Sequence, residues 1–288
     1  MVKLCKLLYQ EILKQQEIRG KVISSFSNSF NVLSNDKIIT VLNSSEKIQP
    51  FSIAGEKITV IPVVDDEITI NERGIYLSGS LICLFDELVI YDPFLCLNYR
   101  STVKKIADNF LKLERLLLSN REIEGIATVL YPHNYSLTKG YEYIVDEIND
   151  WLNYYQYGQK TQLKKKSVDI CGFGYGLTPS CDDFLAGVML CDLMKDIYEN
   201  KNTANKIKEY SDFVHLCKNK TNKISLTLLE NSAQGMCNEV TKNLLQALFS
   251  QEDILEQYAK KMLKIGHCSG ADMLCGILTA YKYAKPKV

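Results

Sequence analysis

Two short segments of this 288-residue chain carry polar residues whose types and spacing could do chemistry. The first holds Gly172, Gly174 and Gly176 at alternate positions, followed by Thr178, a proline, Ser180 and, one residue later, two aspartates. Alternating glycines suit neither a helix nor a strand, so the backbone bends there or approaches another group closely. Thr178 and Ser180 are each typical of a helix N-cap, and proline favours the first helical turn. The backbone N–H groups of such a helix start favour an anionic ligand.

The second segment repeats the end of the first. The pattern Ser-x-x-Asp-x-Leu-x-Gly occurs at residues 180–187 and again at 269–276, and each copy opens an apolar helix. Capping by the serine and aspartate would explain Asp183 and Asp272, and so would ligand binding. Asp182 has no counterpart in the second copy, where alanine stands. Asp182 is therefore the first candidate for a catalytic carboxylate.

Two helix starts carry further candidates. His267 stands directly before the second copy, where an imidazole could carry a proton or hold a substrate carboxylate. Cys268 beside it raises the idea of a thiol nucleophile, but nothing in the sequence argues a role for it. Thr221, Asn222 and Ser225 begin another helix, either as a cap with a surface serine or as part of the same polar pocket.

The glycine-rich segment differs from the two common phosphate loops. A P-loop needs a lysine after its last glycine, and none follows Gly176. The dinucleotide fingerprint is Gly-x-Gly-x-x-Gly, whereas the spacing here is Gly-x-Gly-x-Gly. Asp182 and Asp183 could hold Mg²⁺ beside a bound phosphate, and we expect no other cofactor.

The composition predicts a cytoplasmic protein. The 34 basic and 34 acidic residues cancel, so net charge favours neither nucleic acid nor an anionic membrane. The ten cysteines include no Cys-x-x-Cys pair, which indicates reduced thiols rather than a disulfide framework or a zinc site. The N-terminus does not resemble a signal peptide, and no apolar run approaches the ~20 residues that span a bilayer. A basic cluster, Lys160 with residues 164–166, is either a solvated linker or attracts an anion or an acidic partner.

These residues need a scaffold, and its elements fall into two halves. Leucine and isoleucine at helical spacing predict a first helix over residues 2–18. Short β-branched runs separated by Asn, Asp, Ser and Gly turns then predict a small antiparallel barrel or sandwich. The expected strands cover residues 22–26, 38–42, 58–62, 68–70, 74–77, 81–85 and 88–91.

After Pro93 the pattern becomes helical. The expected helices cover residues 100–119, 137–157, 179–198, 204–217, 222–247, 251–264 and 270–284. The connection 158–178 is long enough to be functional. We therefore expect an α+β fold: an N-terminal antiparallel β module over residues 1–98, barrel- or sandwich-like, and then a larger α-helical domain over 99–288.

Three ordered blocks resemble a family long catalogued as a domain of unknown function and similar to AllH, a subunit associated with oxamate carbamoyltransferase in anaerobic allantoin breakdown. The blocks are Gly-x-Gly-x-Gly-Leu-Thr-Pro-Ser-Gly-Asp-Asp at residues 172–183, Thr-Asn-x-(Val/Ile)-Ser at 221–225 and Gly-His-x-Ser-Gly-x-Asp at 266–272. Cys181 stands where the family has glycine. The resemblance is close in the helical half and general in the β half.

The resemblance implies a subunit of a complex that moves a carbamoyl group between oxalurate and phosphate, giving oxamate and carbamoyl phosphate. It implies partner subunits and a small anionic substrate, while the charge balance and hydropathy argue against nucleic acid and membrane as partners. From the residues themselves we expect His267 and Asp182 to be catalytic. The residues that would bind the substrate are Gly172, Gly174, Gly176, Thr178, Ser180, Asp183, Thr221, Asn222, Ser225, Ser269, Gly270 and Asp272.

Two other classes of protein fit the same residues. A non-catalytic assembly or regulatory subunit would use the three blocks only to fix crossing helices. An independent enzyme would act on another small carboxylate or phosphate without partners. Exposure separates the first of these from a ligand-binding subunit, because a ligand site needs Asp182, Thr178, Ser225 and His267 to converge on an open pocket, whereas a scaffold buries them.

Overall fold

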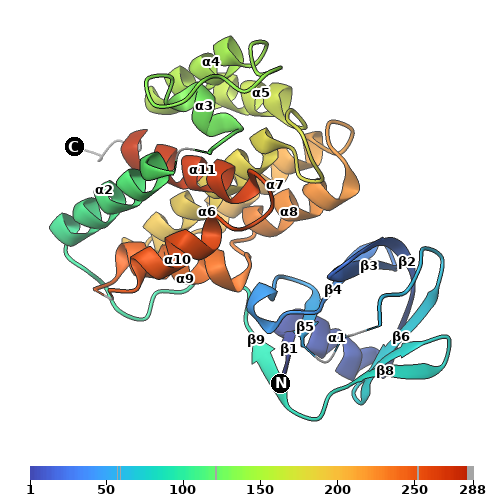
Figure 1. Ribbon diagram of the computed structural model, residues 1–288. Coiled ribbons are helices and arrows are strands. Elements are labelled where there is room, and N and C mark those ends of the chain that lie inside the picture. Colours follow the sequence, from blue (N-terminus) through green and yellow to red (C-terminus); the bar gives the residue numbers. More distant parts are fainter. Residues whose placement is uncertain (57, 59, 121, 252, 284–288) are drawn as a thin grey trace. The chain divides into compact units, whose positions relative to one another are not determined.

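The computed structural model describes residues 1–56, 58, 60–120, 122–251 and 253–283 (Figure 1). The chain forms two compact units. Residues 1–93 and 237–240 form the β unit, and residues 94–236 together with the chain from 241 onward form the helical unit. The predicted class, a β-rich N-terminal module followed by a larger helical region, is confirmed.

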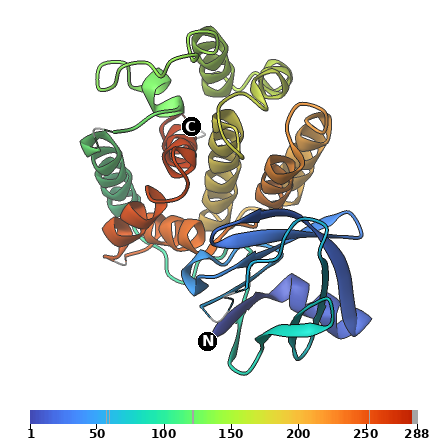
Figure 2. The same ribbon diagram turned by 45° about the vertical axis from the view of Figure 1, so that its right-hand side comes forward.

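The β unit is a single sheet of nine strands in the described residues. The sheet is curled (Figure 2). Its strand order is β8-β7-β6-β2-β3-β4-β5-β1-β9. Most neighbours are antiparallel, as predicted, but β1 pairs with β9 and β4 with β5 in parallel. The strands are β1 (Val2–Cys5), β2 (Glu17–Phe26), β3 (Ser29–Ser34), β4 (Lys37–Leu42), β5 (Ser52–Gly55), β6 (Glu67–Asn71), β7 (Gly74–Leu77), β8 (Ser80–Leu84) and β9 (Leu88–Tyr91), with a short 3₁₀ turn η1 (Ser45–Lys47).

Helix α1 (Lys6–Gln15) packs its buried residues Leu8 and Ile12 into the core of this unit. The prediction of one helix over residues 2–18 is wrong at both ends, because Val2–Cys5 and the chain from Glu17 onward are strands. Val2 and Leu4 are fully buried and lie between two neighbouring strands. Long-range pairing therefore overrides the local helical spacing at the N-terminus.

Three other differences between prediction and structure concern single strands. β3 and β5 were missed, because Ser-Phe-Asn-Val-Leu-Ser and Ser-Ile-Ala-Gly lack the β-branched runs that indicate a strand. Of the expected strand 58–62, Thr59 lies outside the described residues, and Ile58 and residues 60–62 are not in a strand.

The helical unit contains ten helices in its described residues, the first two residues of α9 belonging to the β unit. They are α2 (Val103–Ser119), α3 (Ile126–Leu130), α4 (Val145–Gln156), α5 (Lys160–Ile170), α6 (Ser180–Tyr198), α7 (Ala204–Leu216), α8 (Lys223–Ala233), α9 (Glu239–Phe249), α10 (Leu255–Met262) and α11 (Ser269–Tyr283). None of the described helices is long and apolar enough to cross a membrane.

The expected helices differ from the observed ones at three places. Most of the expected loop 158–178 is helix α5, whose polar, lysine-rich sequence carries little helical periodicity. The expected helix 222–247 is two helices, α8 and α9, separated at Gly235, whose φ of 72° ends a helical turn. Helix α4 starts at Val145 rather than at residue 137, and the short helix α3 was not predicted.

Helices α6 and α11 cross at the centre of the helical unit. A Cβ atom on Gly187 of α6 would lie 2.2 Å from the backbone oxygen of Met273, and one on Gly276 of α11 would lie 2.0 Å from that of Phe184. Glycine at both positions therefore lets the two backbones touch. These glycines end the two Ser-x-x-Asp-x-Leu-x-Gly copies, so the repeat marks a matched helix pair whose serine ends lie together.

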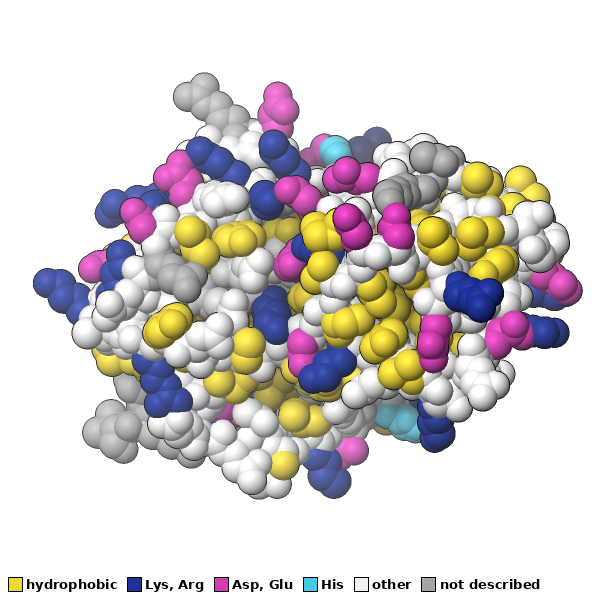
Figure 3. All heavy atoms as spheres, turned by 90° about the horizontal axis from the view of Figure 1, so that it is seen from below, with side chains coloured by type: hydrophobic (Ala, Val, Ile, Leu, Met, Phe, Trp, Pro, Cys, Tyr) yellow, Lys and Arg dark blue, Asp and Glu magenta, His cyan; other side chains and the backbone are white. Residues whose placement is uncertain are grey.

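Seen from below, hydrophobic side chains form groups among charged ones on the face in Figure 3. In the β unit, both edge strands carry exposed apolar side chains. Leu81 and Leu84 on β8 are 49% and 48% exposed, and Val89 and Ile90 on β9 are 42% and 41% exposed. Apolar edge strands are typical of surfaces that contact another chain.

Candidate functional site

The glycine-rich loop before α6 takes its shape from three left-handed glycines. Gly172, Gly174 and Gly176 have φ values of 83°, 120° and 99°. A Cβ atom on Gly172 would lie 1.9 Å from the backbone oxygen of Lys220, and one on Gly174 would lie 2.4 Å from the nitrogen of Ser180. The loop is therefore pressed against the chain before α8 and the start of α6, whereas Gly176 faces open space.

Asp182 ties this loop to the start of α8. Its Oδ1 accepts a hydrogen bond from the Gly172 nitrogen at 2.7 Å. Its Oδ2 accepts from Thr221 Oγ1 at 2.5 Å and from Ser225 Oγ at 2.6 Å. Asp182 is fully buried, so both oxygens are used within the protein. The geometry makes Asp182 a clamp between two helix starts.

Asn222 adds a second tie. Its side-chain oxygen caps α8 by accepting hydrogen bonds from the nitrogens of Ile224 and Ser225. Its Nδ2 donates to the backbone oxygen of Leu177 at 2.9 Å. The predicted Thr-Asn-x-x-Ser block therefore lies against the glycine-rich loop. The contact between Asn222 and Leu177 joins two exposed residues.

Asp183 lies where the α6 and α11 helix starts meet. Its Oδ2 accepts a hydrogen bond from Thr178 Oγ1 at 2.8 Å, and Thr178 Oγ1 lies 3.0 Å from Ser269 Oγ. Asp183 is 2% exposed. Burial raises the pKa of Asp183 well above its ordinary value, with a further contribution from Asp272. The Asp183 carboxyl is thereby favoured in its neutral form.

Asp272 is the matching carboxyl on α11. Its Oδ1 accepts a hydrogen bond from the Ile126 nitrogen at 2.7 Å and so caps the short helix α3. Burial raises the pKa of Asp272 to about 7, although the nearby Ser180 hydroxyl and the Ile126 N–H lower it. A Cβ on Gly125 would lie 2.3 Å from Oδ1, so only glycine leaves room for this carboxyl.

Ser180 joins a neighbouring polar contact that sequence reasoning missed. Its Oγ lies 2.6 Å from Tyr141 Oη and 3.5 Å from Cys268 Sγ. Tyr141 is buried and comes from the chain before α4, where no sequence motif marks it. Sequence reasoning also missed Gly125, which lies beside Asp272. Its φ of 80° is a backbone angle that a sequence does not show.

His267 lies at the surface. Its side chain is 82% exposed, and Nε2 lies 3.0 Å from Oε2 of Glu124, which is 59% exposed. His267 is therefore outside the buried contacts, although Cys268 beside it reaches Ser180.

Gly270, another predicted residue of this block, is buried by packing, because a Cβ there would lie 1.8 Å from the Met262 backbone oxygen.

The three blocks thus meet at one place, which we call the polar centre. It consists of the starts of α6, α8 and α11 with the side chains of Thr178, Ser180, Asp182, Asp183, Thr221, Ser225, Ser269 and Asp272. Ser180, Ser225 and the three aspartates are buried, whereas residues 172–178, Asn222 and Ser269 are at least partly exposed. The partly exposed groups here are therefore the glycine-rich loop beside the polar centre, Thr221, Asn222 and Ser269.

The polar centre does not suit Mg²⁺. Both oxygens of Asp182 already accept hydrogen bonds, and Oδ2 of Asp183 accepts one from Thr178, so neither carboxyl is free of partners within the protein. The described residues also contain no group of three or more His, Cys, Asp or Glu side chains arranged to hold a metal ion.

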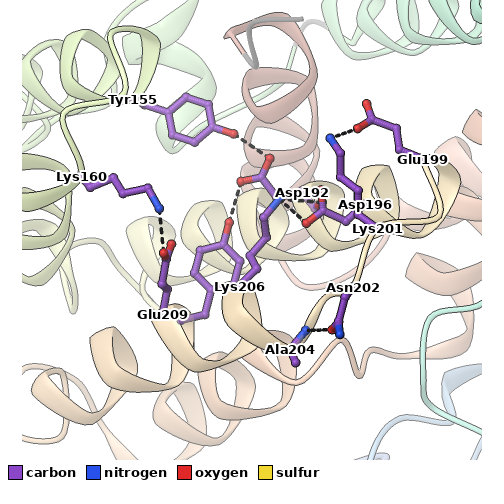
Figure 4. A network of polar contacts seen from close by, with 11 residues as sticks. Tyr155, Lys160, Asp192, Asp196, Glu199, Lys201, Asn202, Ala204, Lys206 and Glu209 are labelled. Atoms are coloured by element: carbon purple, nitrogen blue, oxygen red, sulfur yellow. Dashed lines mark hydrogen bonds and ion pairs between the residues drawn. The ribbon is translucent and has the colours of Figure 1, made fainter. Parts of the chain in front are cut away.

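Another buried carboxyl, that of Asp192, lies further along α6 (Figure 4). Asp192 accepts hydrogen bonds from Tyr155 Oη of α4 at 2.9 Å and from Tyr210 Oη of α7 at 2.6 Å. Lys206 pairs with Asp196 at 2.7 Å and donates to the Asp192 backbone oxygen. This network holds α6 between α4 and α7 and leaves the Asp192 carboxyl satisfied.

Two cavities of the helical unit lie away from the polar centre. One of about 630 Å³ is lined by residues of α3 and of the α3–α4 connection, including His133 and Asn134. One of about 680 Å³ is mainly apolar and is lined by α2 and the C-terminal parts of α6 and α11. Neither is lined by residues of the polar centre.

Comparison with known proteins agrees with the sequence blocks. No solved structure matches this chain. The polar centre and all three blocks lie within a single matched segment: residues 170–281 match the family model described as oxamate carbamoyltransferase subunit AllH, which confirms the resemblance seen in the sequence.

Proposed function

We propose that this chain is a subunit of an oxamate carbamoyltransferase and that its glycine-rich loop binds a small anion of that reaction. The candidate anions are oxamate, oxalurate, phosphate and carbamoyl phosphate. The family match supports the first part of the proposal. The observation that carries the second part is the meeting of three helix starts at a partly exposed glycine-rich loop.

The electrostatics of the polar centre support an anion there. Helix starts carry the positive ends of helix dipoles, although the first N–H groups of α8 are capped by Asn222 and those of Cys181 and Gly270 donate to backbone oxygens. Buried carboxylates would oppose an anion, but the raised pKa values of Asp183 and Asp272 favour their neutral forms. Asp182 accepts three hydrogen bonds, so its charge is stabilised within the protein.

Each group then has a definite role in the proposal. The backbone N–H groups around Gly174 and Gly176 hold the phosphate or carboxylate, while the Thr178 hydroxyl donates its proton to Asp183 and fixes the end of the loop. Fixed N–H donors of this kind also stabilise the oxyanion that develops during carbamoyl transfer. Asp182 positions the loop. His267, oriented by Glu124 at 3.0 Å, is placed to exchange a proton with the medium.

A non-catalytic assembly subunit is the second candidate, and two observations favour it. Asp182 and Ser225 are fully buried and satisfied, as expected of a scaffold. The edge strands β8 and β9 also expose apolar side chains that a partner could cover. In that role the chain would fix crossing helices and leave the ligand to another subunit.

Ligand-dependent unfolding of the purified chain separates the two candidates. The unfolding temperature would be measured with oxamate, phosphate, carbamoyl phosphate and Mg²⁺, separately and together. A ligand that binds only the folded state, at about 100 times its dissociation constant, adds roughly 2.7 kcal/mol to stability. We expect a rise with at least one of the three anions and none with Mg²⁺ alone. No rise with any anion would contradict the proposed site and favour the assembly role.

A further inference from the structure

Strand β9 forms one border of the nine-stranded sheet and leaves one of its own sides open. Among the strands that the structure describes, it has β1 as a neighbour on one side and none on the other (Figure 1). The Val2 nitrogen donates to the Glu87 oxygen at 2.9 Å, so Glu87 and every second residue after it turn their backbone groups toward β1. Leu88 and Ile90 therefore direct their N–H and C=O groups away from the sheet. Such an edge can pair with another extended chain.

The side chains of β9 leave this border uncovered on both faces of the sheet. Val89 and Ile90 are adjacent, so they point to opposite faces, and they are 42% and 41% exposed. The four residues of β9 pair with β1 without a register shift and include no proline or lysine, the usual obstacles to edge pairing. At the other border, the pairing of β7 with β8 shifts between Ile75 and Tyr76, and such irregularities protect an edge. β9 is therefore the border that favours a partner strand.

Acidic residues stand at both ends of β9. Asp86 and Glu87 precede the strand, Asp92 follows it, and residues 74–99 contain no lysine or arginine. Glu87 lies 3.6 Å from the amino terminus of the chain, and Asp92 lies 2.8 Å from Lys6. The side chains of both pairs are at least 44% exposed, so these carboxylates remain accessible to a further cation. The border thus combines an apolar centre with acidic ends.

A second copy of this chain fits the border poorly. An antiparallel pair of two β9 strands has its twofold axis at Val89 or at Ile90, and both registers set Asp92 of the copy opposite or diagonal to Asp86. Like charges placed in this way destabilise a strand pair. We propose instead that β9 pairs with an extended segment of a different chain, apolar at its centre and with lysine or arginine at its ends. The proposal rests on the subunit role proposed above and adds the chemistry of the partner.

A peptide matched to this border tests the proposal. The sequence Lys-Val-Thr-Val-Thr-Val-Lys, with blocked ends, sets its lysines opposite Asp86 and Asp92 in either strand direction. Fluorescence anisotropy at low salt measures its affinity for the full chain. We expect it to bind at least tenfold more tightly than the same peptide with glutamate at both ends. Ile90→Pro should weaken binding at least tenfold, because it removes an outward N–H group, whereas Val103→Pro, at the first position of α2, is the control and should not.

The outcomes separate this inference from the proposed anion site. Equal affinity for the two peptides, no binding of either, or unchanged binding by Ile90→Pro would overturn the inference. A dimer of the unaltered chain that Ile90→Pro dissociates, measured by sedimentation, would assign the border to a second copy and overturn it as well. The anion site is tested separately by the ligand-dependent unfolding described above. The comparison of the two peptides on the unaltered chain decides the inference even where the variant does not fold.

Discussion

Gly187 and Gly276 each lie against the backbone of the other's helix, at equivalent points of the α6–α11 crossing. Gly187 faces Met273 and Ile277, and Gly276 faces Phe184 and Val188; these are equivalent positions, the first within and the second directly after each Ser-x-x-Asp-x-Leu-x-Gly copy. The pair is therefore related by a local twofold. This relationship explains why Asp183 and Asp272 both lie at the polar centre, since matched crossing points place the two helix starts together.

Gly276→Ala should destabilise the helical unit by about 2–3 kcal/mol or more, because a Cβ there would lie 2.0 Å from the Phe184 oxygen. The direction of the change in unfolding free energy is informative, since replacing glycine by alanine inside a helix ordinarily stabilises it by about 1 kcal/mol. Urea unfolding monitored by circular dichroism measures the change. An unchanged or raised midpoint would show that α6 and α11 do not touch at this glycine.

Asp182→Ala should destabilise the protein by about 3 kcal/mol, because it leaves the Gly172 N–H and two hydroxyls without their acceptor. Asp182→Asn should cost less, since its oxygen can serve Gly172 while the hydroxyls of Thr221 and Ser225 turn to accept from its NH₂ group. Unfolding free energies of both variants test the clamp. Equal stability of Asp182→Ala and the unaltered chain would exclude it.

Stability should fall as pH rises from about 4 to about 7, in part because of Asp272. Its pKa is about 7 in the folded protein against an ordinary value of 3.8, so the folded state holds a proton that the unfolded chain has lost. The contribution is fully present below pH 4, is lost as pH rises to about 7 and amounts to at most about 4 kcal/mol. The difference in unfolding free energy between the unaltered chain and Asp272→Asn, followed against pH, isolates it. A difference that stays flat from pH 4 to 8 would contradict the burial of this carboxyl.

Tyr210→Phe should cost about 1–2 kcal/mol, because it removes a hydrogen bond of 2.6 Å to the buried Asp192 carboxyl. Tyr155→Phe should act similarly, and the two changes should not be additive, since both hydroxyls serve one carboxyl. Tyr143→Phe, at a side chain that is 85% exposed, is the matched control. Strictly additive effects in the double variant would show that Asp192 does not couple the two tyrosines.

The polar centre could be located from sequence largely because its signals are local. Glycine spacing, the Thr-Pro-Ser helix start and the repeated Ser-x-x-Asp are read from neighbouring residues, and the structure brings these segments together. Tyr141 and Gly125 could not be found in this way. They reach Ser180 and Asp272 from elsewhere in the chain, through a hydroxyl contact and a left-handed backbone turn.

The fold, too, has parts that follow from local sequence signals and parts that depend on distant contacts. The helical and β-rich halves follow from periodicity and turn residues, which act over a few positions. Val2–Cys5 shows where such reasoning stops, because its strand is defined by two partners, β5 and β9, more than 45 residues away. Helix α5 was missed for the opposite reason, since its surface is polar and little of it is buried.

The loop itself provides the most direct test of anion binding. Gly176→Ala places a side chain at φ 99°, where the nearest backbone atom is 3.9 Å away, so it strains the loop without a clash. Gly158→Ala, at φ 66° with no atom within 4 Å, applies a similar strain outside the polar centre. Calorimetric titration of the unaltered chain and both variants with oxamate, phosphate and carbamoyl phosphate measures the affinity. We predict that at least one of these anions binds the unaltered chain and Gly158→Ala and binds Gly176→Ala at least tenfold more weakly; equal affinity in all three proteins would contradict a binding site at the glycine-rich loop.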